Sequence, residues 1–294
     1  MKNTKTHFYI SLIAGLGLFV QSCTNNMPNT VQSKDGVRIS YEVRGTGEPA
    51  ILFVHGWANN KTLWNEQMDH FSKKYTVVAL DLAGFGESGN NRTAWTIDNF
   101  SNDVIAVIDE LDVKKVVLVG FSMGGPVAVE TADKIPEKIA GVVLADNMKN
   151  VDKKFPLQAL PHFDSVMMDL VTNPTKEKLI AGGFFKRHPD KEFQQALNMV
   201  KNTTKIGWVE AGNNLIYWKN DSCTSALASL KVPVSAINSD HTPTDTAAIR
   251  NYVPGFEVNV IKNSGHTVML EAPEEFDSLL DRYIIEFTHQ IVSK

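Results

Sequence analysis

A serine flanked by glycines stands where a nucleophile can be exposed. Residues 120–125 read GFSMGG, after an apolar run at 116–119 and before a helix-like stretch at 126–131. Small residues let the backbone turn sharply around Ser122 and leave room for a substrate. The start of the following helix would direct free N–H groups and a positive dipole end at developing negative charge. We therefore predict that Ser122 is the nucleophile of an acyl-transfer reaction.

A histidine near the C-terminus has the chemistry needed to activate that serine. His266 ends the segment NSGH at 263–266, which follows a strand-like run at 258–261. Imidazole titrates near neutral pH, so it can accept the serine proton and later return it. We predict that His266 is the general base.

Alternating strands and helices must bring these two side chains together. A helix is predicted at 97–111 from its apolar stripe, and Pro273 can open a C-terminal helix. Near-continuous apolar runs are typical of parallel strands that helices cover on both faces. These runs lie at 50–54, 76–80, 116–119, 142–145 and 234–237. The pattern predicts an α/β fold with a mostly parallel, doubly wound sheet.

Residues 147–230 interrupt this alternation. They contain four prolines, many lysines and a high content of methionine and aromatic residues, without a strong strand pattern. We predict a mostly helical cap insertion over the sheet rather than an independent domain. Its methionine and aromatic side chains could line an apolar pocket, since methionine adapts to irregular shapes.

Four motifs together resemble those of the α/β-hydrolase family. HGW at 55–57 resembles its oxyanion loop, DLAGFGES at 81–88 its D-x-x-G-x-G-x-S turn, GFSMGG its nucleophile elbow, and Gly265-His266 its catalytic histidine. The resemblance covers residues 36–290 and implies the α/β-hydrolase fold. It also implies an oxyanion hole formed by the backbone N–H groups of Trp57 and Met123, with His55 supporting the loop.

The carboxylate that orients the histidine has two leading candidates. The base needs an acid to orient its ring and to stabilise the imidazolium. The family usually places this acid after the strand at 234–237, where Asp240 lies, although direct counting falls on Thr242. Asp146, at the end of the preceding strand, is the rival, and Asp245 is a weaker third choice. We expect Asp240 to be the acid, with Asp146 as the alternative.

Composition and missing motifs exclude several other classes of function. The 294 residues carry a net charge of −4 without a long basic run, so a nucleic-acid partner is not expected. Two cysteines, Cys23 and Cys223, exclude a disulfide scaffold and a four-cysteine zinc site. No H-E-x-x-H, P-loop or dinucleotide-binding pattern is present, so we expect neither a metal nor an organic cofactor.

The N-terminus has the pattern of a secretion signal. Two lysines precede an apolar run at 8–20, which is short for a membrane-spanning helix and is followed by VQSC. This ending resembles a bacterial lipobox, although Gln21 is bulkier than the usual residue. We predict a lipoprotein signal peptide at 1–22, lipidation of Cys23, a tether at 23–35 and a hydrolase domain at 36–294. The expected location is lipid-anchored in the bacterial cell envelope, or else secreted or periplasmic.

The combined prediction is a serine hydrolase that cleaves a small ester or related acyl compound through an acyl-enzyme on Ser122. Serine rather than aspartate at this position argues against a dehalogenase or an epoxide hydrolase. Three alternatives use the same scaffold: a haloperoxidase-like perhydrolase, a carbon–carbon bond hydrolase, and a non-catalytic binding protein. The sequence does not determine the acyl length, the membrane face or the oligomeric state.

Overall fold

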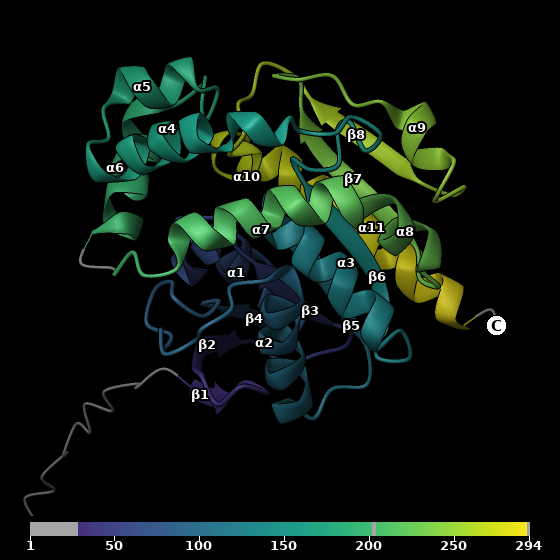
Figure 1. Cartoon of the computed structure of the whole chain (residues 1–294). Coiled ribbons are helices and arrows are strands. Elements are labelled where there is room, and N and C mark those ends of the chain that lie inside the picture. The colour runs from purple at the N-terminus through teal and green to yellow at the C-terminus, as the bar shows by residue number, and fades with distance from the viewer. Residues whose placement is uncertain (1–28, 202–203, 293–294) are drawn as a thin grey trace, which may run out of the picture.

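The computed structural model describes residues 29–201 and 204–292 (Figure 1). The predicted signal peptide at 1–22 and the predicted lipidation site Cys23 lie outside these residues. Within the described part of the chain, no helix has both the length and the apolar character required to cross a bilayer.

A mostly parallel sheet of eight strands lies at the centre of the fold. The strand order is β1-β2-β4-β3-β5-β6-β7-β8. Strand β2 pairs antiparallel with both β1 and β4, and all other neighbouring strands pair parallel. The strands are β1 (Asn29–Gln32), β2 (Arg38–Arg44), β3 (Ala50–Val54), β4 (Val77–Leu80), β5 (Val116–Phe121), β6 (Ile139–Ala145), β7 (Val234–Ser239) and β8 (Glu257–Ile261). The predicted fold class is therefore confirmed.

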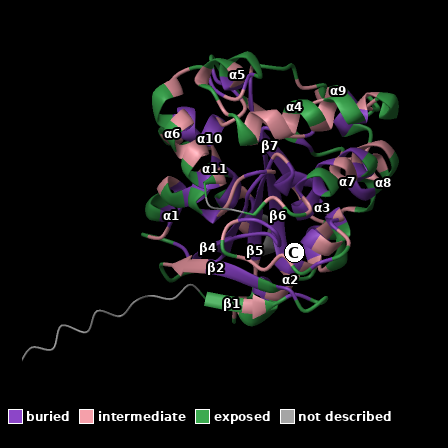
Figure 2. Cartoon of the chain, turned by 60° about the vertical axis from the view of Figure 1, so that its left-hand side comes forward, coloured by how far each residue is buried: buried purple, intermediate pink, exposed green. Residues whose placement is uncertain are grey.

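The central strands are buried along their whole length, as their apolar sequences predict. Every residue of β3, β4, β5, β6 and β7 is buried. Figure 2 shows this buried material in the sheet, beneath helices with exposed outer faces. Alternate residues of β3 pack into separate hydrophobic cores on the two faces of the sheet. Leu52 belongs to one core, whereas Ile51 and Phe53 belong to the other. A strand can be apolar throughout because both of its faces are covered.

Helices cover the two faces of the sheet in separate layers. One face carries α2 (Ile97–Glu110), α3 (Gly124–Lys134) and α8 (Cys223–Ser229), and the other carries α1 (Asn65–Phe71), α10 (Val268–Glu271) and α11 (Pro273–Val292). The helix predicted at 97–111 is α2, whose N-terminus is capped by the Thr96 side chain. The helix predicted to begin at Pro273 is α11. Two shorter elements complete the domain, the 3-10 helix η1 (Lys61–Trp64) and α9 (Thr246–Arg250).

A helical cap lies over the carboxyl ends of the strands (Figure 1). It consists of the 3-10 helix η2 (Leu157–Ala159), α4 (Leu160–Thr172), α5 (Lys176–Ala181), α6 (Pro189–Val200) and α7 (Trp208–Asp221). Helix α8 falls inside the predicted insertion at 147–230, but it packs against α3 in the sheet layer. Cys223, at its start, is a buried free thiol.

The N-terminal boundary also differs from the prediction. Residues 29–32, assigned to the tether at 23–35, form the edge strand β1 and pair with β2 from Asn29 to Gln32. Four residues that are mostly exposed carry little apolar signal, so the pairing is provided by the backbone of β2 rather than by side-chain burial.

The contact between β6 and α11 leaves no room for a side chain at Gly141. A Cβ built there would overlap the ring of Phe287, which is 2% exposed. We expect Gly141→Ala to lower the free energy of unfolding by about 1–3 kcal/mol, because a crowded core must shift its backbone or its side chains. Chemical unfolding in urea measures this change. Gly255→Ala is the matched control, since a Cβ there meets nothing within 4 Å; equal stability of the two variants would contradict the packing argument.

Candidate active site

Ser122 lies at a sharp turn between β5 and α3. Its φ is 50°, a left-handed conformation that non-glycine residues rarely adopt. The end of β3 lies so close to this turn that glycine is required, because a Cβ on Gly124 would overlap the carbonyl oxygen of Val54. The turn is therefore strained and tightly packed, and it holds the serine at the carboxyl end of the sheet, half-buried in the wall of a cavity.

His266 and Asp146 form a hydrogen-bonded pair beside this serine. The distance from His266 Nδ1 to Asp146 Oδ2 is 2.6 Å, and the Asp146 side chain is 4% exposed. The imidazole also packs against Phe121, with ring centroids 4.7 Å apart, and it lines the same cavity as Ser122. With Nδ1 engaged by the carboxylate, Nε2 is the ring nitrogen that remains for chemistry.

The second oxygen of Asp146 is bound from two sides. Asp146 Oδ1 accepts the backbone N–H of Ser239 at 2.6 Å and the Lys149 ammonium at 2.7 Å. Burial acts to raise the pKa of Asp146, but the hydrogen bond and charge of His266, with the ammonium of Lys149, outweigh it and lower the pKa to about 2. This carboxyl is therefore ionised over the whole physiological pH range, which suits it to hold an imidazolium.

The structure does not bring Asp240 to the histidine ring, contrary to the preferred sequence prediction. Asp240 instead accepts the backbone N–H groups of Asn263 at 2.9 Å and Ser264 at 3.3 Å. These bonds stabilise the loop that leads to His266, in which Asn263 has a φ of 53°. The third candidate, Asp245, caps α9 through the N–H of Ala248. Of the three predicted acids, Asp146 is the one that contacts His266.

Asn147 links the strand end that carries Asp146 to the turn that carries the serine. Its side-chain amide donates to the carbonyl oxygen of Ser122, and its side-chain oxygen accepts the N–H of Met148 at 2.7 Å. The backbone N–H of Asn147 in turn donates to Asn238 Oδ1 at 2.9 Å. Residues at the ends of β5, β6 and β7 thus form one hydrogen-bonded assembly.

The two predicted oxyanion donors are the backbone N–H groups of Trp57, in the loop after β3, and Met123, next to Ser122. Within the described residues, the backbone N–H groups of Trp57 and Met123 donate to no protein acceptor. His55 is fully buried and supports this loop: its Nε2 accepts the N–H of Leu82 at 3.0 Å, and its Nδ1 lies 2.7 Å from the carbonyl oxygen of Gly56. Burial lowers the pKa of His55, so it is a neutral structural residue. The two free N–H groups could stabilise an oxyanion.

The loop that carries His266 is hydrogen-bonded to the cap. The N–H of His266 donates to the carbonyl oxygen of Gly183 at 2.8 Å, and the N–H of Thr267 donates to that of Phe184 at 2.9 Å. Glu271 joins the same segments, since it accepts the N–H of Gly265 at 2.6 Å and that of Lys186. The histidine is therefore positioned by the cap as well as by Asp146.

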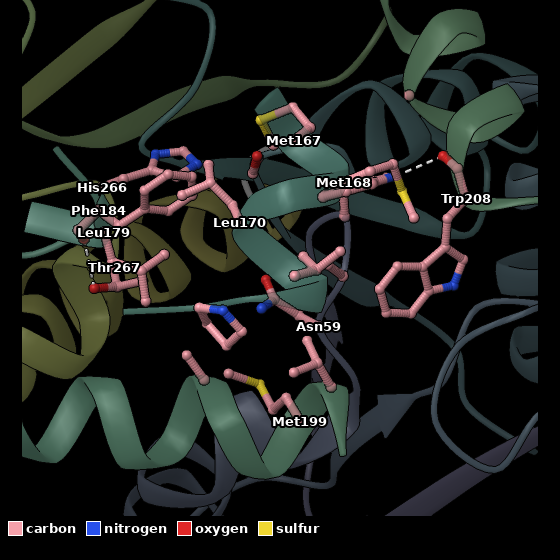
Figure 3. Close-up of a pocket in the computed structure, with 18 of the residues that line it drawn as sticks. Asn59, Met167, Met168, Leu170, Leu179, Phe184, Met199, Trp208, His266 and Thr267 are labelled. Atoms are coloured by element: carbon pink, nitrogen blue, oxygen red, sulfur yellow. Dashed lines mark hydrogen bonds between the residues drawn. The ribbon is translucent and has the colours of Figure 1, made fainter. Parts of the chain in front are cut away.

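A mainly apolar cavity of about 210 Å³ lies between Ser122 and the cap. Figure 3 shows its walls, with Met199 of α6 on one side and His266 and Phe184 on another. The cap contributes apolar side chains from four helices, among them Met167, Met168, Leu170, Leu179, Met199 and Trp208. The apolar part of a small molecule fits such surroundings.

Sequence reasoning missed two charged residues of this region. Lys149 follows Asp146 by three residues, a spacing that could have indicated an ion pair. Glu192 lies on the cavity face of α6 with Ala196 and Met199, so its helical spacing places an acid in an otherwise apolar stripe. Over residues 29–201 and 204–292, no group of three or more His, Cys, Asp or Glu side chains is arranged to hold a metal ion.

The ion pair of Lys149 and Asp146 can be tested through stability. The pKa of Asp146 is lowered from 3.8 to about 2 in the folded chain, so its contribution to stability is present above pH 4 and is lost as the pH falls toward 2. Lys149→Met keeps the apolar stem but removes one cause of the lowering. We expect the variant to be less stable by about 1 kcal/mol at pH 7, with the difference shrinking below pH 4.

Urea unfolding at several pH values measures this difference. Lys153→Met, at an exposed lysine of the same loop, is the control and should unfold like the parent. A Lys149→Met deficit that stayed constant down to pH 2 would show that the ammonium acts through packing and not through Asp146.

Comparisons with known proteins agree with this architecture. The sequence model of the alpha/beta hydrolase fold matches residues 49–273. Over 139 residues the chain is 33% identical to an uncharacterized protein of Mycobacterium tuberculosis (strain ATCC 25618 / H37Rv), a match that spans 46% of this chain but 40% of that protein. AB hydrolase superfamily protein YisY of Bacillus subtilis (strain 168) is 25% identical over 269 residues, 87% of this chain and 99% of the relative.

A solved structure has the same arrangement over nearly its full length. It is a thermophilic esterase from Thermogutta terrifontis, with a TM-score of 0.75, 23% identity and coverage of 89% of this chain and 99% of that one. At this identity the likeness concerns the fold. Because the family model spans most of the chain, this protein belongs to the alpha/beta hydrolase fold family.

Proposed function

We propose that the protein is a serine hydrolase that cleaves a small ester or a related acyl compound. The observation that carries this proposal is the 2.6 Å hydrogen bond between His266 and the buried carboxylate of Asp146, beside Ser122 at its strained turn. A serine, an ionised carboxylate and an imidazole, in the chain order Ser122, Asp146 and His266, are the groups needed for acyl transfer. The esterase from Thermogutta terrifontis, which shares the fold, is consistent with this assignment.

The first half of the reaction forms an acyl-enzyme. His266 Nε2 takes the proton of Ser122 Oγ as that oxygen attacks the carbonyl carbon of the ester. The oxyanion that forms accepts hydrogen bonds from the N–H groups of Trp57 and Met123. When the intermediate collapses, the bond to the leaving alcohol breaks, and the imidazolium returns its proton to the alcohol oxygen.

In the second half of the reaction, water is the nucleophile and Ser122 is the leaving group. His266 takes a proton from a water molecule, whose oxygen attacks the acyl carbon. Collapse of the second intermediate breaks the bond to Ser122 Oγ, which regains its proton, and releases the carboxylic acid. Asp146 stays ionised throughout and holds the imidazole in one orientation.

The assignment of the nucleophile is tested by Ser122→Ala. We expect hydrolysis of p-nitrophenyl butyrate to fall by about 10⁴-fold or more, because the covalent route is lost while binding and the oxyanion donors remain. A fluorophosphonate probe should label the parent chain and not the variant, with circular dichroism as the control for folding. Unchanged turnover in the variant would remove Ser122 from the mechanism, and a parent chain that resists the probe would favour a binding protein.

The assignment of the acid is tested by comparing two isosteric variants. We expect Asp146→Asn to lower kcat by roughly 10³- to 10⁴-fold, since the amide favours the wrong tautomer of His266. Asp240→Asn should lower kcat by less than about tenfold, because Asp240 contacts the backbone at 263–264 and the Lys186 ammonium but not the His266 ring. The measurement is kcat on the same ester at equal folded fraction. If Asp240→Asn were the more damaged variant, Asp240 would be the acid.

A further inference from the structure

A buried carboxyl group in the cavity wall has no partner. Glu192 of α6 is 2% exposed and lines the cavity that also contains Ser122 and His266. Within the described residues, neither of its carboxyl oxygens has a hydrogen-bond partner on another residue. Leaving a buried carboxyl unpaired is costly, so such a group is expected to have a use.

The neighbours of Glu192 do not neutralise it. Lys191, the adjacent residue, points to Glu66 of α1 instead, at 2.6 Å. Glu271 of α10 is a second nearby acid, and its oxygens are engaged by backbone N–H groups of the loop before His266 and of the cap. Glu192 therefore faces a negative surrounding, in which a bound anion would be repelled.

The cations of the elements packed against α6 are engaged elsewhere. Helix α6 contacts α5 and η1. The charged pairs that involve these elements are Lys176 with Asp190, Lys178 with Asp169, and Lys61 with Asp81 and Glu87. Burial raises the pKa of Glu192 to about 7, with smaller contributions in the same direction from Glu271 and Glu66, against the lowering effects of its own backbone N–H and of Lys191.

The remaining residues that line the cavity also make it acidic rather than basic. Asp164 of α4 is a second carboxyl in the wall, but it already accepts a hydrogen bond from Asn213 at 3.1 Å. No lysine or arginine from the described part of the chain lines the cavity. An acidic, mostly apolar cavity is complementary to a molecule with an apolar body and a donor or positive charge at its end.

We propose that Glu192 is the recognition site for an amine-bearing acyl substrate, in which an alkyl chain occupies the apolar cavity and a terminal ammonium pairs with this carboxylate. The proposal rests on the proposed function and names its substrate class. Glu192, Ala196 and Met199 lie on one face of α6, so an extended chain can follow the apolar side chains of this helix toward the acid. A neutral donor such as a hydroxyl would bind at the same place more weakly.

Binding to the full chain tests this proposal without requiring catalysis. Calorimetry at pH 8 measures the affinities of hexylamine, hexanol and hexanoate for three proteins: the parent, Glu192→Gln and Glu177→Gln. Glu177 is an exposed acid of the same cap, so Glu177→Gln is the control. We expect the parent and the control to bind hexylamine at least tenfold more tightly than hexanoate, and Glu192→Gln to lose this preference. In the parent, hexylamine affinity should also rise between pH 6 and pH 8 as Glu192 ionises. Equal binding of amine and carboxylate by the parent would overturn the proposal without any variant.

Turnover separates this proposal from the proposed function. The kcat/KM of p-nitrophenyl 6-aminohexanoate relative to that of p-nitrophenyl heptanoate should fall at least tenfold in Glu192→Gln and stay unchanged in Glu177→Gln. If both esters were hydrolysed with the same ratio in all three proteins, the role of Glu192 would be wrong and the hydrolase assignment would stand. If hexylamine bound through Glu192 but no ester were hydrolysed, the hydrolase assignment would fail and the amine site would stand.

Discussion

The hydrogen bond from His266 to Asp146 is the interaction on which the rest of the site depends. It holds the imidazole in one orientation and leaves Nε2 for the serine. The carboxylate can do this in a buried place because its other oxygen is bound by Ser239 N–H and by Lys149. Left-handed backbone at Ser122, Asp146 and Asn263 concentrates strain at this edge of the sheet, where the surrounding hydrogen bonds compensate for it.

The cap and the loop that carries His266 are parts of one hydrogen-bonded unit. Backbone bonds join His266 and Thr267 to the cap segment at 183–184, and Glu271 binds N–H groups from both sides of that contact. The same cap segment contributes Phe184 to the cavity wall (Figure 3). The shape of the cavity and the position of the base are therefore coupled, because a movement of this segment would displace both.

Two buried carboxyl groups of this region differ in their pairing. Asp146 is buried and paired behind His266, whereas Glu192 is buried in the cavity wall of the cap with no partner on another described residue. Paired burial keeps a carboxylate ionised, as the low pKa of Asp146 indicates, and unpaired burial does the reverse at Glu192. The two carboxyl groups are thus suited to different tasks: Asp146 can hold the His266 imidazole, and Glu192 can receive a complementary group from a ligand.

The sequence by itself determined the fold and singled out two candidate site residues, Ser122 and His266, because these depend on local patterns. Apolar runs predict buried parallel strands, and GFSMGG predicts a sharp turn at Ser122 that requires glycine at 120 and 124. Which aspartate contacts His266 was decided by tertiary structure, since Asp146 and Asp240 both follow neighbouring strands at the same sheet edge. The backbone turn at Asp146 directs its carboxyl to His266, while that of Asp240 meets the N–H groups at 263–264. Glu192 likewise became visible only when packing showed which partners it lacks, because hydrogen bonds between distant segments have no signature in a linear pattern.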